Sequence, residues 1–271
     1  MNLKFRKKIA QIKPIHKLCR AIMYDSSFFY YRKQYKKNNY KEIFAKLKDS
    51  RKGERCFIIG NGPSLKSDDL DKLVSEDCFG TNEIHKIFRQ TRWRPKYYVI
   101  IDRYSKSTPE QIKALECETV FLSDYYCRFN KVLRDKYICL HQHFNWNENN
   151  YLFSTDIKKC FVSSPTVSYA AMQIAAYLGY SEVYLLGFDH NYSFEFDSDG
   201  KVVNTGKSDT HFFKDEVPED IIADVLGMTR AYQSFKRYAD DNGIKVRNAT
   251  RGGKLDVFER VDFDSLFDIQ S

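Results

Sequence analysis

The chain has 271 residues, of which 42% are hydrophobic and 15% aromatic. This composition suits one large globular domain with appendages and excludes an intrinsically disordered chain. The net charge of +8 is uneven, because residues 1–55 hold 17 Lys and Arg against 4 Asp and Glu, leaving 27 against 32 in the rest. A basic N-terminal extension on a mildly acidic domain argues against a nucleic-acid-binding core.

The cysteines and the apolar runs give expectations about the compartment. The seven cysteines are odd in number and none has CxxC spacing, so neither a zinc site nor a disulfide framework is expected. The start lacks a long apolar stretch, and no run of 18 apolar residues exists. We therefore expect no signal peptide, no membrane-spanning helix and a cytoplasmic location, with peripheral contact at the inner membrane face as an option.

Residues 1–52 are predicted to form a basic, amphipathic, helical extension. Apolar residues recur every three or four positions, with an interruption or a kink of the helix expected near Pro14: Ile9, Ile12, Ile15, Leu18 and Ile22. A second aromatic and basic stretch follows over residues 28–47. Two interpretations remain open: a helix docked on the domain with a solvated basic side, or an anchor on anionic lipids.

Residues 53–271 alternate short apolar runs with helical patterns, which predicts a Rossmann-like α/β domain. Strands are expected at residues 56–59, 78–82, 97–101, 119–122, 137–140, 182–186 and 244–248. Their spacing favours a mostly parallel sheet with helices on both faces.

Helices are expected between these strands. One should start at a Ser67 cap, and another should run from Val167 to Leu178 and end at Gly179. A third follows from helical spacing between Ile221 and Phe235. The polar stretches near 123–160 and 191–216 are expected to be irregular, lid-like loops.

Ligands of such sheets bind beyond the carboxyl ends of the strands. The first of these ends is the loop Gly60-Asn61-Gly62-Pro63-Ser64. Its glycines let the backbone approach a ligand, and free N–H groups before a helix favour a phosphate. An ordinary strand-to-helix turn is the alternative.

Other strand ends add further candidates. Ser163, Ser164 and Thr166 precede a helix, where they suit either an anion site or plain N-capping. Asp102 and Asp189 could hold a ribose or a metal, or simply cap a turn.

Two histidines are candidates for a general base. His211 lies in a polar loop, where an imidazole that changes charge near neutral pH suits deprotonation of an acceptor hydroxyl. His190, just past a strand end, is its rival.

Several features, in order, resemble glycosyltransferase family 42, the bacterial sialyltransferases, whose relatives form the MptE-like (DUF115) superfamily. They are an apolar strand, the run from Gly60 to Leu65, a Ser/Thr-rich helix start, a helix ending at Leu178-Gly179-Tyr180, and the strand from Tyr184 to Asp189. The likeness spans roughly residues 55–250.

This resemblance implies a metal-free, inverting transfer from a CMP-activated sugar, without a cofactor. It implies nucleotide contacts for Asn61, Gly62 and Ser64, a donor-pocket role for Asn82, and nucleotide binding by Ser163, Ser164 and Thr166. His211 looks like the family's catalytic base, and Tyr192 alone could assist the leaving phosphate. Asp102 stands where the sialyltransferases have Asn, and Pro165 interrupts their Thr-Ser-Gly pattern.

Three functions follow. The first is an inverting glycosyltransferase that moves sialic acid or a related sugar to a glycan or lipid-linked glycan, as a monomer or an oligomer. The second is an MptE-like pyrophosphokinase acting on a pterin alcohol, with Mg²⁺ on Asp102 and Asp189. The third is a nucleotide-binding scaffold without turnover.

Overall fold

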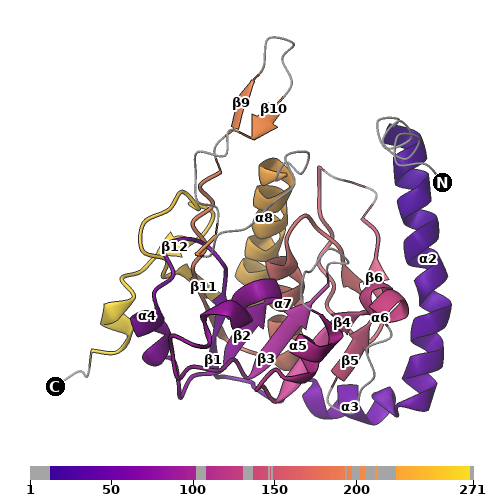
Figure 1. Cartoon of the computed structure of the whole chain (residues 1–271), viewed down its shortest axis with the longest axis horizontal. Coiled ribbons are helices and arrows are strands. Elements are labelled where there is room, and N and C mark those ends of the chain that lie inside the picture. The colour runs from indigo at the N-terminus through magenta and orange to yellow at the C-terminus, as the bar shows by residue number, and fades with distance from the viewer. Residues whose placement is uncertain are drawn as a thin grey trace.

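The computed structural model describes residues 13–101, 108–130, 137–145, 147, 149–192, 194–196, 202–204, 211–212 and 224–268. Its centre is an eight-stranded sheet in the order β12-β11-β8-β1-β2-β3-β4-β5 (Figure 1). Every pairing within this sheet is parallel. The predicted Rossmann-like α/β architecture is therefore confirmed.

Most strands of the sheet coincide with the apolar runs of the sequence. Seven of them match the predicted runs: β1 (Arg55–Ile59), β2 (Cys78–Thr81), β3 (Tyr97–Ile100), β4 (Thr119–Ser123), β5 (Tyr137–Leu140), β8 (Glu182–Leu186) and β11 (Lys245–Asn248). The eighth, β12 (Glu259–Arg260), consists of two exposed charged residues and was not predicted. Nearly all residues of β1 to β5 and β8 are buried, as expected for parallel strands covered on both faces.

Two small ribbons stand apart from this sheet. Strand β6 (Gln142–His143) pairs in parallel with β7 (Phe161–Val162), and β9 (Phe194–Phe196) pairs with β10 (Val202–Asn204) as an antiparallel hairpin. The hairpin projects from the end of the molecule that carries the carboxyl ends of the strands (Figure 1).

The chain changes direction in the middle of the sheet. From β1 it proceeds through β2, β3 and β4 to β5 on one side, whereas β8, β11 and β12 lie in succession on the other. The connections therefore reverse between β1 and β8. Such a topological switch point opens a crevice at the carboxyl ends of its two strands, where ligands of open α/β sheets bind.

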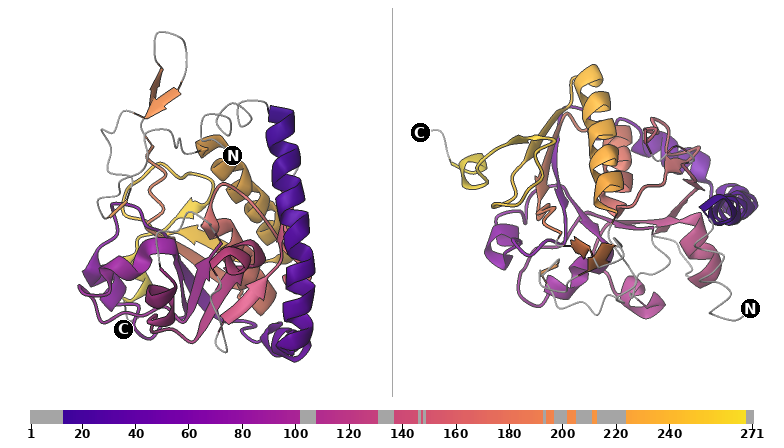
Figure 2. Two further views of the ribbon diagram at one scale, coloured as in Figure 1. Left: turned by 45° about the vertical axis from the view of Figure 1, so that its right-hand side comes forward. Right: turned by 90° about the horizontal axis from the view of Figure 1, so that it is seen from above.

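Helices cover both faces of the sheet (Figure 2). Helices α7 (Val167–Leu178) and α8 (Val225–Asn242) lie on one face, and the short helices α4 (Ser67–Asp71) and α5 (Pro109–Lys113) lie on the other. Helix α7 ends at Gly179, whose φ of 90° is the left-handed C-cap conformation expected from the sequence. The remaining helices are η1 (Asn82–Ile87), α6 (Asp124–Asn130) and η2 (Asp264–Leu266).

Three local expectations were wrong. The supposedly irregular stretch after β4 begins with helix α6. Helix α4 has Lys66 at its N-cap, without a capping side chain, because the Ser67 hydroxyl bonds to Asp68 instead. Leu226, one of the apolar residues of the helical pattern between Ile221 and Phe235, is 69% exposed and does not pack on the core. Asp224 is the N-cap of that helix, and Ile221 lies outside the described residues.

The N-terminal segment forms helices α2 (Lys13–Lys37) and α3 (Tyr40–Leu47), which flank the β5 edge of the sheet (Figure 1). Pro14 lies in the first turn of α2, where proline is tolerated. Ile9 and Ile12 of the predicted pattern lie outside the described residues, so the expected break near Pro14 stays a prediction. Tyr31 of α2 and Phe44 of α3 are buried in the core. The described part of the extension therefore docks on the domain through one side.

The other side of α2 exposes large apolar residues. Ile15, Leu18, Ile22 and Phe29 are between 41% and 74% exposed. At 3.6 residues per turn, these four positions fall within an arc of about 60°. Lys33 and Lys36, both exposed, continue the same arc toward the end of the helix. We call this surface the α2 stripe. No helix among the described residues has the length and apolar content needed to span a bilayer.

Candidate functional site

A cleft of about 180 Å³ opens at the switch point between β1 and β8. Segments from seven parts of the chain line it: the loop after β1, the end of β2, the start of α7, the turn after β8, the segment at His211, part of α8, and the segment after β11. The lining residues are Gly60, Asn61, Gly62, Pro63, Thr81, Asn82, Pro165, Thr166, Val167, Ser168, Gly187, Phe188, Asp189, His190, Asn191, Tyr192, His211, Met228, Tyr232 and Leu255.

The loop after β1 is attached to the end of β8 by backbone hydrogen bonds. Gly60 donates its N–H to the Leu186 carbonyl at 2.8 Å, and Gly62 donates to the Gly187 carbonyl at 2.9 Å. A Cβ atom on residue 62 would lie only 1.9 Å from Oδ2 of Asp189 and 2.6 Å from the Gly187 carbonyl oxygen. Only glycine fits at position 62 without displacing the floor of the cleft.

Asp189 fixes the same loop from the other side. Its Oδ2 accepts the Ser64 hydroxyl at 2.8 Å, and its Oδ1 accepts the Ser64 N–H at 3.2 Å. Burial raises the pKa of Asp189 above its ordinary value, while the two hydrogen bonds from Ser64 partly oppose that rise. Ser64 lies outside the cleft lining and acts on the cleft through Asp189.

These contacts correct one argument from the sequence. The loop was expected to present free N–H groups to a phosphate. The N–H groups of Gly60, Gly62, Ser64 and Leu65 instead bond to β8, to Asp189 or within the loop. Their role is to hold the loop in shape, so a phosphate needs other donors in the cleft.

Helix α7 offers such a place. Its first turn lines the cleft and holds no acidic residue, so the positive end of the helix dipole faces the cavity. Thr166 caps the helix by accepting the Ser168 N–H at 3.3 Å, and its hydroxyl lies 3.4 Å from the Tyr232 hydroxyl. N-capping by one of the predicted hydroxyl residues is thus observed.

The two neighbouring serines do not line the cleft. Ser164 forms a local turn, in which its hydroxyl donates to the Thr166 carbonyl and accepts the Thr166 N–H. Ser163 is buried, and its N–H donates to the His143 carbonyl at 2.9 Å. Both support the start of α7.

Asn61 and Asn82, which follow the ends of β1 and β2, both line the cleft. Asn61 donates its amide to the Thr81 carbonyl at 3.3 Å. The Oδ1 atoms of both asparagines are buried, and no group in the described part of the chain donates to them. A buried oxygen without a donor costs about 1–3 kcal/mol, which a bound ligand or water removes. Asn82 also has a φ of 44°, an unusual conformation that often marks a functional site.

The structure brings His211 to the cleft. The N–H of the next residue, Phe212, donates to the Asn61 carbonyl at 2.9 Å, and His211 itself lines the cavity. Tyr192 lines it as well, and burial followed by the charge of Asp189 raises the pKa of its phenol. Asp102 lies outside the described residues.

His190 also lines the cleft, with a φ of 51°. Its Nε2 lies 2.9 Å from the Thr229 hydroxyl, which itself donates to the Val225 carbonyl at 2.8 Å. The network therefore assigns the ring proton to Nε2 and leaves Nδ1 as an acceptor. Burial lowers the pKa of His190 and favours this neutral form.

Sequence reasoning missed the contributions of α8 to the site. Met228 and Tyr232 line the cleft together with Leu255. In the sequence, Met228 and Tyr232 have only the spacing of an ordinary core helix, and no local pattern marks Leu255 as a site residue.

Within the described ranges, no group of three His, Cys, Asp or Glu residues is placed to hold a metal ion.

A family model described as "6-hydroxymethylpterin diphosphokinase MptE-like" matches residues 31–195. The match covers the loop after β1, the start of α7 and the turn after β8. The chain belongs to this MptE-like family.

One solved structure is similar to the MptE-like chain described above. It is the sialyltransferase CstII from Campylobacter jejuni, solved with the substrate analogue CMP-3FNeuAc, with 15% sequence identity and a TM-score of 0.46. The similarity covers 77% of this chain and 86% of the other. By their descriptions both matches are transferases. No curated protein sequence matches the chain.

Proposed function

We propose that the protein is an inverting glycosyltransferase that uses a nucleotide-activated sugar, with CMP as the nucleotide and sialic acid or a related sugar as the transferred group. The observation that supports this proposal is that His211 lies on the same cleft as Asn61 and Asn82, because Phe212 is tied to the Asn61 carbonyl. A base, two unpaired amide acceptors and a helix N-terminus then meet where such folds bind nucleotides.

In this proposal the donor's phosphate lies against the first turn of α7, near Thr166. The Oδ1 atoms of Asn61 and Asn82 accept hydrogen bonds from the amino or hydroxyl groups of the nucleoside. Gly60, Gly62, Ser64 and Asp189 shape the floor. Ser163 and Ser164 support α7.

The proposed reaction has one displacement step. An acceptor hydroxyl attacks the anomeric carbon of the donor sugar, and its proton passes to the His211 imidazole. The bond between that carbon and the phosphate oxygen breaks, and the nucleotide leaves with the negative charge, near α7 and the Tyr192 phenol. Attack on the face opposite the leaving group inverts the anomeric centre.

The MptE-like family match supports a second candidate, transfer of a diphosphoryl group from ATP to a pterin alcohol. This reaction also needs a base for a hydroxyl and a cradle for a nucleotide. Asp189 would then be a Mg²⁺ ligand. Its two carboxylate oxygens accept hydrogen bonds from Ser64, and each keeps a lone pair for a metal.

The same proposal places the protein at an anionic membrane surface, near a lipid-linked glycan acceptor. The α2 stripe combines exposed apolar side chains with lysines on one arc of the helix. This pattern fits an interface between anionic headgroups and acyl chains.

Binding and turnover test the proposal together. We expect CMP to raise the melting temperature more than CDP, UDP, GDP or ATP at equal concentration. His211→Ala should lower sugar transfer by about 10²- to 10⁴-fold with CMP binding intact. His143→Ala, at an exposed histidine on β6, is the matched control. Near-wild-type transfer by His211→Ala would refute the mechanism, and Mg²⁺-dependent turnover of ATP would establish the second candidate.

A further inference from the structure

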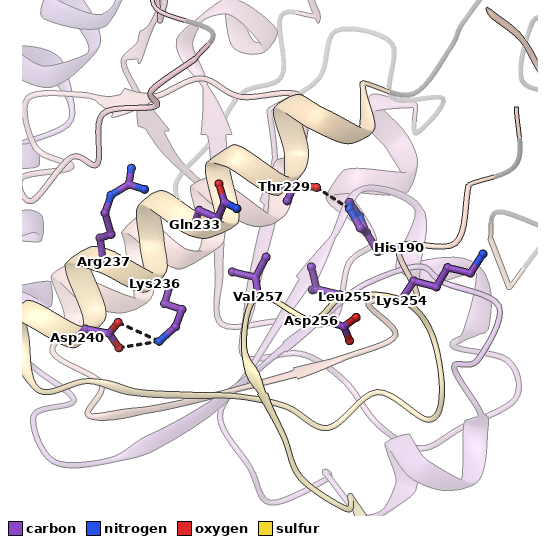
Figure 3. A pocket seen from close by; sticks show the side chains of 10 residues that line it. All are labelled: His190, Thr229, Gln233, Lys236, Arg237, Asp240, Lys254, Leu255, Asp256 and Val257. Carbon is purple, nitrogen blue, oxygen red and sulfur yellow. Dashed lines mark hydrogen bonds and ion pairs between the residues drawn. The ribbon is translucent and has the colours of Figure 1, made fainter. Parts of the chain in front are cut away.

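A groove of about 580 Å³ lies beside the cleft, between α8 and the segment that follows β11 (Figure 3). It is lined by His190, Thr229, Gln233, Lys236, Arg237, Asp240, Lys254, Leu255, Asp256 and Val257. Two of these residues, His190 and Leu255, line the cleft as well. The groove and the cleft are therefore neighbours that share a wall.

The cations of the groove differ in how they are engaged. Lys236 forms an ion pair with Asp240 at 2.9 Å, one turn further along α8. Arg237 donates to Oδ1 of Asn150 at 3.0 Å. For Lys254, the residues described here supply no carboxylate within ion-pair distance. Lys254 lies at the His190 end of the groove, away from the Lys236–Asp240 pair (Figure 3).

The backbone at Lys254 is held against the turn that follows β8. The Lys254 N–H donates to the Asp189 carbonyl at 2.7 Å. The preceding Gly253 has a φ of 80°, and a Cβ atom there would lie 2.8 Å from the Asp189 Cα. This close packing fixes the base of the Lys254 side chain relative to Asp189 and His190.

His190 contributes a neutral acceptor at the shared wall. Because its Nε2 proton is engaged by Thr229, its Nδ1 is available to accept a hydrogen bond from a hydroxyl group. A ligand in the groove would thus meet a hydroxyl-binding atom next to the cleft and, beside it, the Lys254 ammonium group, which no carboxylate of the described ranges pairs.

We propose that this groove binds the second substrate, and that Lys254 recognises a carboxylate or phosphate group on it. The inference rests on the proposed transfer of a sugar to a hydroxyl acceptor, and it narrows that acceptor to an acidic or phosphorylated glycan. The charge-assisted bond to Lys254 holds the anion, while His190 positions a hydroxyl near the cleft.

Ligand-observed NMR with galactose, galacturonic acid and galactose 6-phosphate tests the proposal. Galacturonic acid separates a carboxylate requirement from a phosphate requirement, and galactose is the neutral reference. We expect at least one of the anionic sugars to bind wild-type protein more tightly than galactose does. Lys254→Gln should weaken that binding about tenfold and leave galactose binding unchanged.

Lys236→Gln is the matched control within the groove, because its ammonium group is already paired with Asp240. It should change the affinity for the anionic sugars by less than about twofold. Equal binding of the neutral and anionic sugars to wild type, or unchanged anion binding in Lys254→Gln, would overturn the proposal. So would the failure of all three sugars to bind.

CMP and ATP binding to the same samples separates this inference from the proposed function. If CMP stabilises the protein but Lys254→Gln still binds the anionic sugars normally, only the groove assignment fails. If ATP binds in place of CMP while the Lys254 effect persists, the glycosyltransferase proposal fails and the anion site remains.

Discussion

The backbone N–H of Phe212 donates to the carbonyl oxygen of Asn61 at 2.9 Å. This bond joins the segment that holds His211 to the first loop of the sheet. Asn61 bonds in turn to the end of β2 through its side chain. The segment of the candidate base is therefore attached to the loop that lines the cleft.

Replacing Phe212 with proline removes this donor. Phe212→Pro should lower kcat for transfer by about tenfold or more, because a small displacement of a catalytic group is costly. The affinity for CMP should stay within about twofold. Phe212→Leu keeps the N–H and should retain most of the activity. Wild-type kcat in Phe212→Pro would show that His211 is positioned by other contacts.

Gly62→Ala tests the close approach of the loop to Asp189. The added methyl would lie 1.9 Å from Oδ2 of Asp189, so the loop must move. We expect a loss of unfolding free energy of about 1–3 kcal/mol, together with loss of nucleotide binding. Gly53→Ala is the control, since its Cβ meets no atom within 4 Å and only its φ of 85° opposes alanine. It should cost about 1 kcal/mol and leave nucleotide binding intact. Equal nucleotide affinity in Gly62→Ala and wild type would contradict the assignment of the loop after β1 to the nucleotide site.

His190→Asn should make the protein less sensitive to acid. Burial lowers the pKa of His190 from 6.5, so the folded state binds fewer protons than the unfolded state just below that pH. Stability is therefore lost as the pH falls through about 6.5. Asparagine tolerates the left-handed φ at this position.

The measurement is the urea midpoint at several pH values between about 7 and 5. The wild-type midpoint should fall more steeply than that of His190→Asn. A residual slope is expected in the variant, because burial also lowers the pKa of His85. Parallel curves for the two proteins would exclude His190 as a source of the acid sensitivity.

Asp124→Ala should be strongly destabilising. The Asp124 side chain is fully buried, its Oδ2 lies 2.6 Å from Nδ1 of His141, and its Oδ1 accepts the N–H groups of Tyr125 and Gln142. The substitution removes a buried acceptor shared by three hydrogen bonds, at a cost of about 3 kcal/mol in a chemical denaturation experiment. Glu259→Ala, at an exposed ion pair with Arg247, should cost no more than about 1 kcal/mol. Similar values for the two variants would argue against the buried pair as a structural anchor.

Binding to vesicles that contain anionic phospholipids tests the α2 stripe. The double variant Leu18→Ser, Ile22→Ser removes two exposed apolar side chains and should lower cosedimentation about tenfold. The melting temperature should not change, because neither side chain is in the core. Val74→Ser, at a valine that is 54% exposed elsewhere, controls for surface polarity. Undiminished binding of the double variant would exclude the stripe as the contact surface.

Most of the sheet could be predicted from sequence, because parallel strands buried on both faces appear as short, continuous apolar runs. The start of α7 was predicted for a similar reason, since Thr166 caps it and its apolar period is regular. Helix α6 was missed because Asp124, Tyr125 and Tyr126 have polar atoms that made the segment look like a loop. The polar atoms of this segment are buried against partners that are distant in sequence, such as His141 for Asp124. No local sequence pattern indicates these partners.

Part of the site could also be predicted, because strand ends of a parallel sheet converge. Asn61, Asn82, Thr166, Asp189, Tyr192 and His211 all line one cleft. The hydrogen-bond partner of each of these polar groups could not be predicted. The spacing of Ser64 and Asp189 gave no sign that they bond to each other. The sequence pattern of α8 gave Tyr232 the place of an ordinary core residue. Its position at the cleft depends on how α8 packs on α7, which the sequence of α8 alone does not show.

Helices α2 and α3 have a consequence for any shortened form of the protein. The outermost strand β5 has its Cys139 N–H satisfied by the Tyr40 hydroxyl at 2.8 Å, and helix α2 packs against this strand. Removing the basic segment would leave an apolar strand with unpaired amides at the border of the sheet, which is a template for intermolecular pairing. A truncated chain should therefore self-associate, so the N-terminal segment also protects the fold from aggregation.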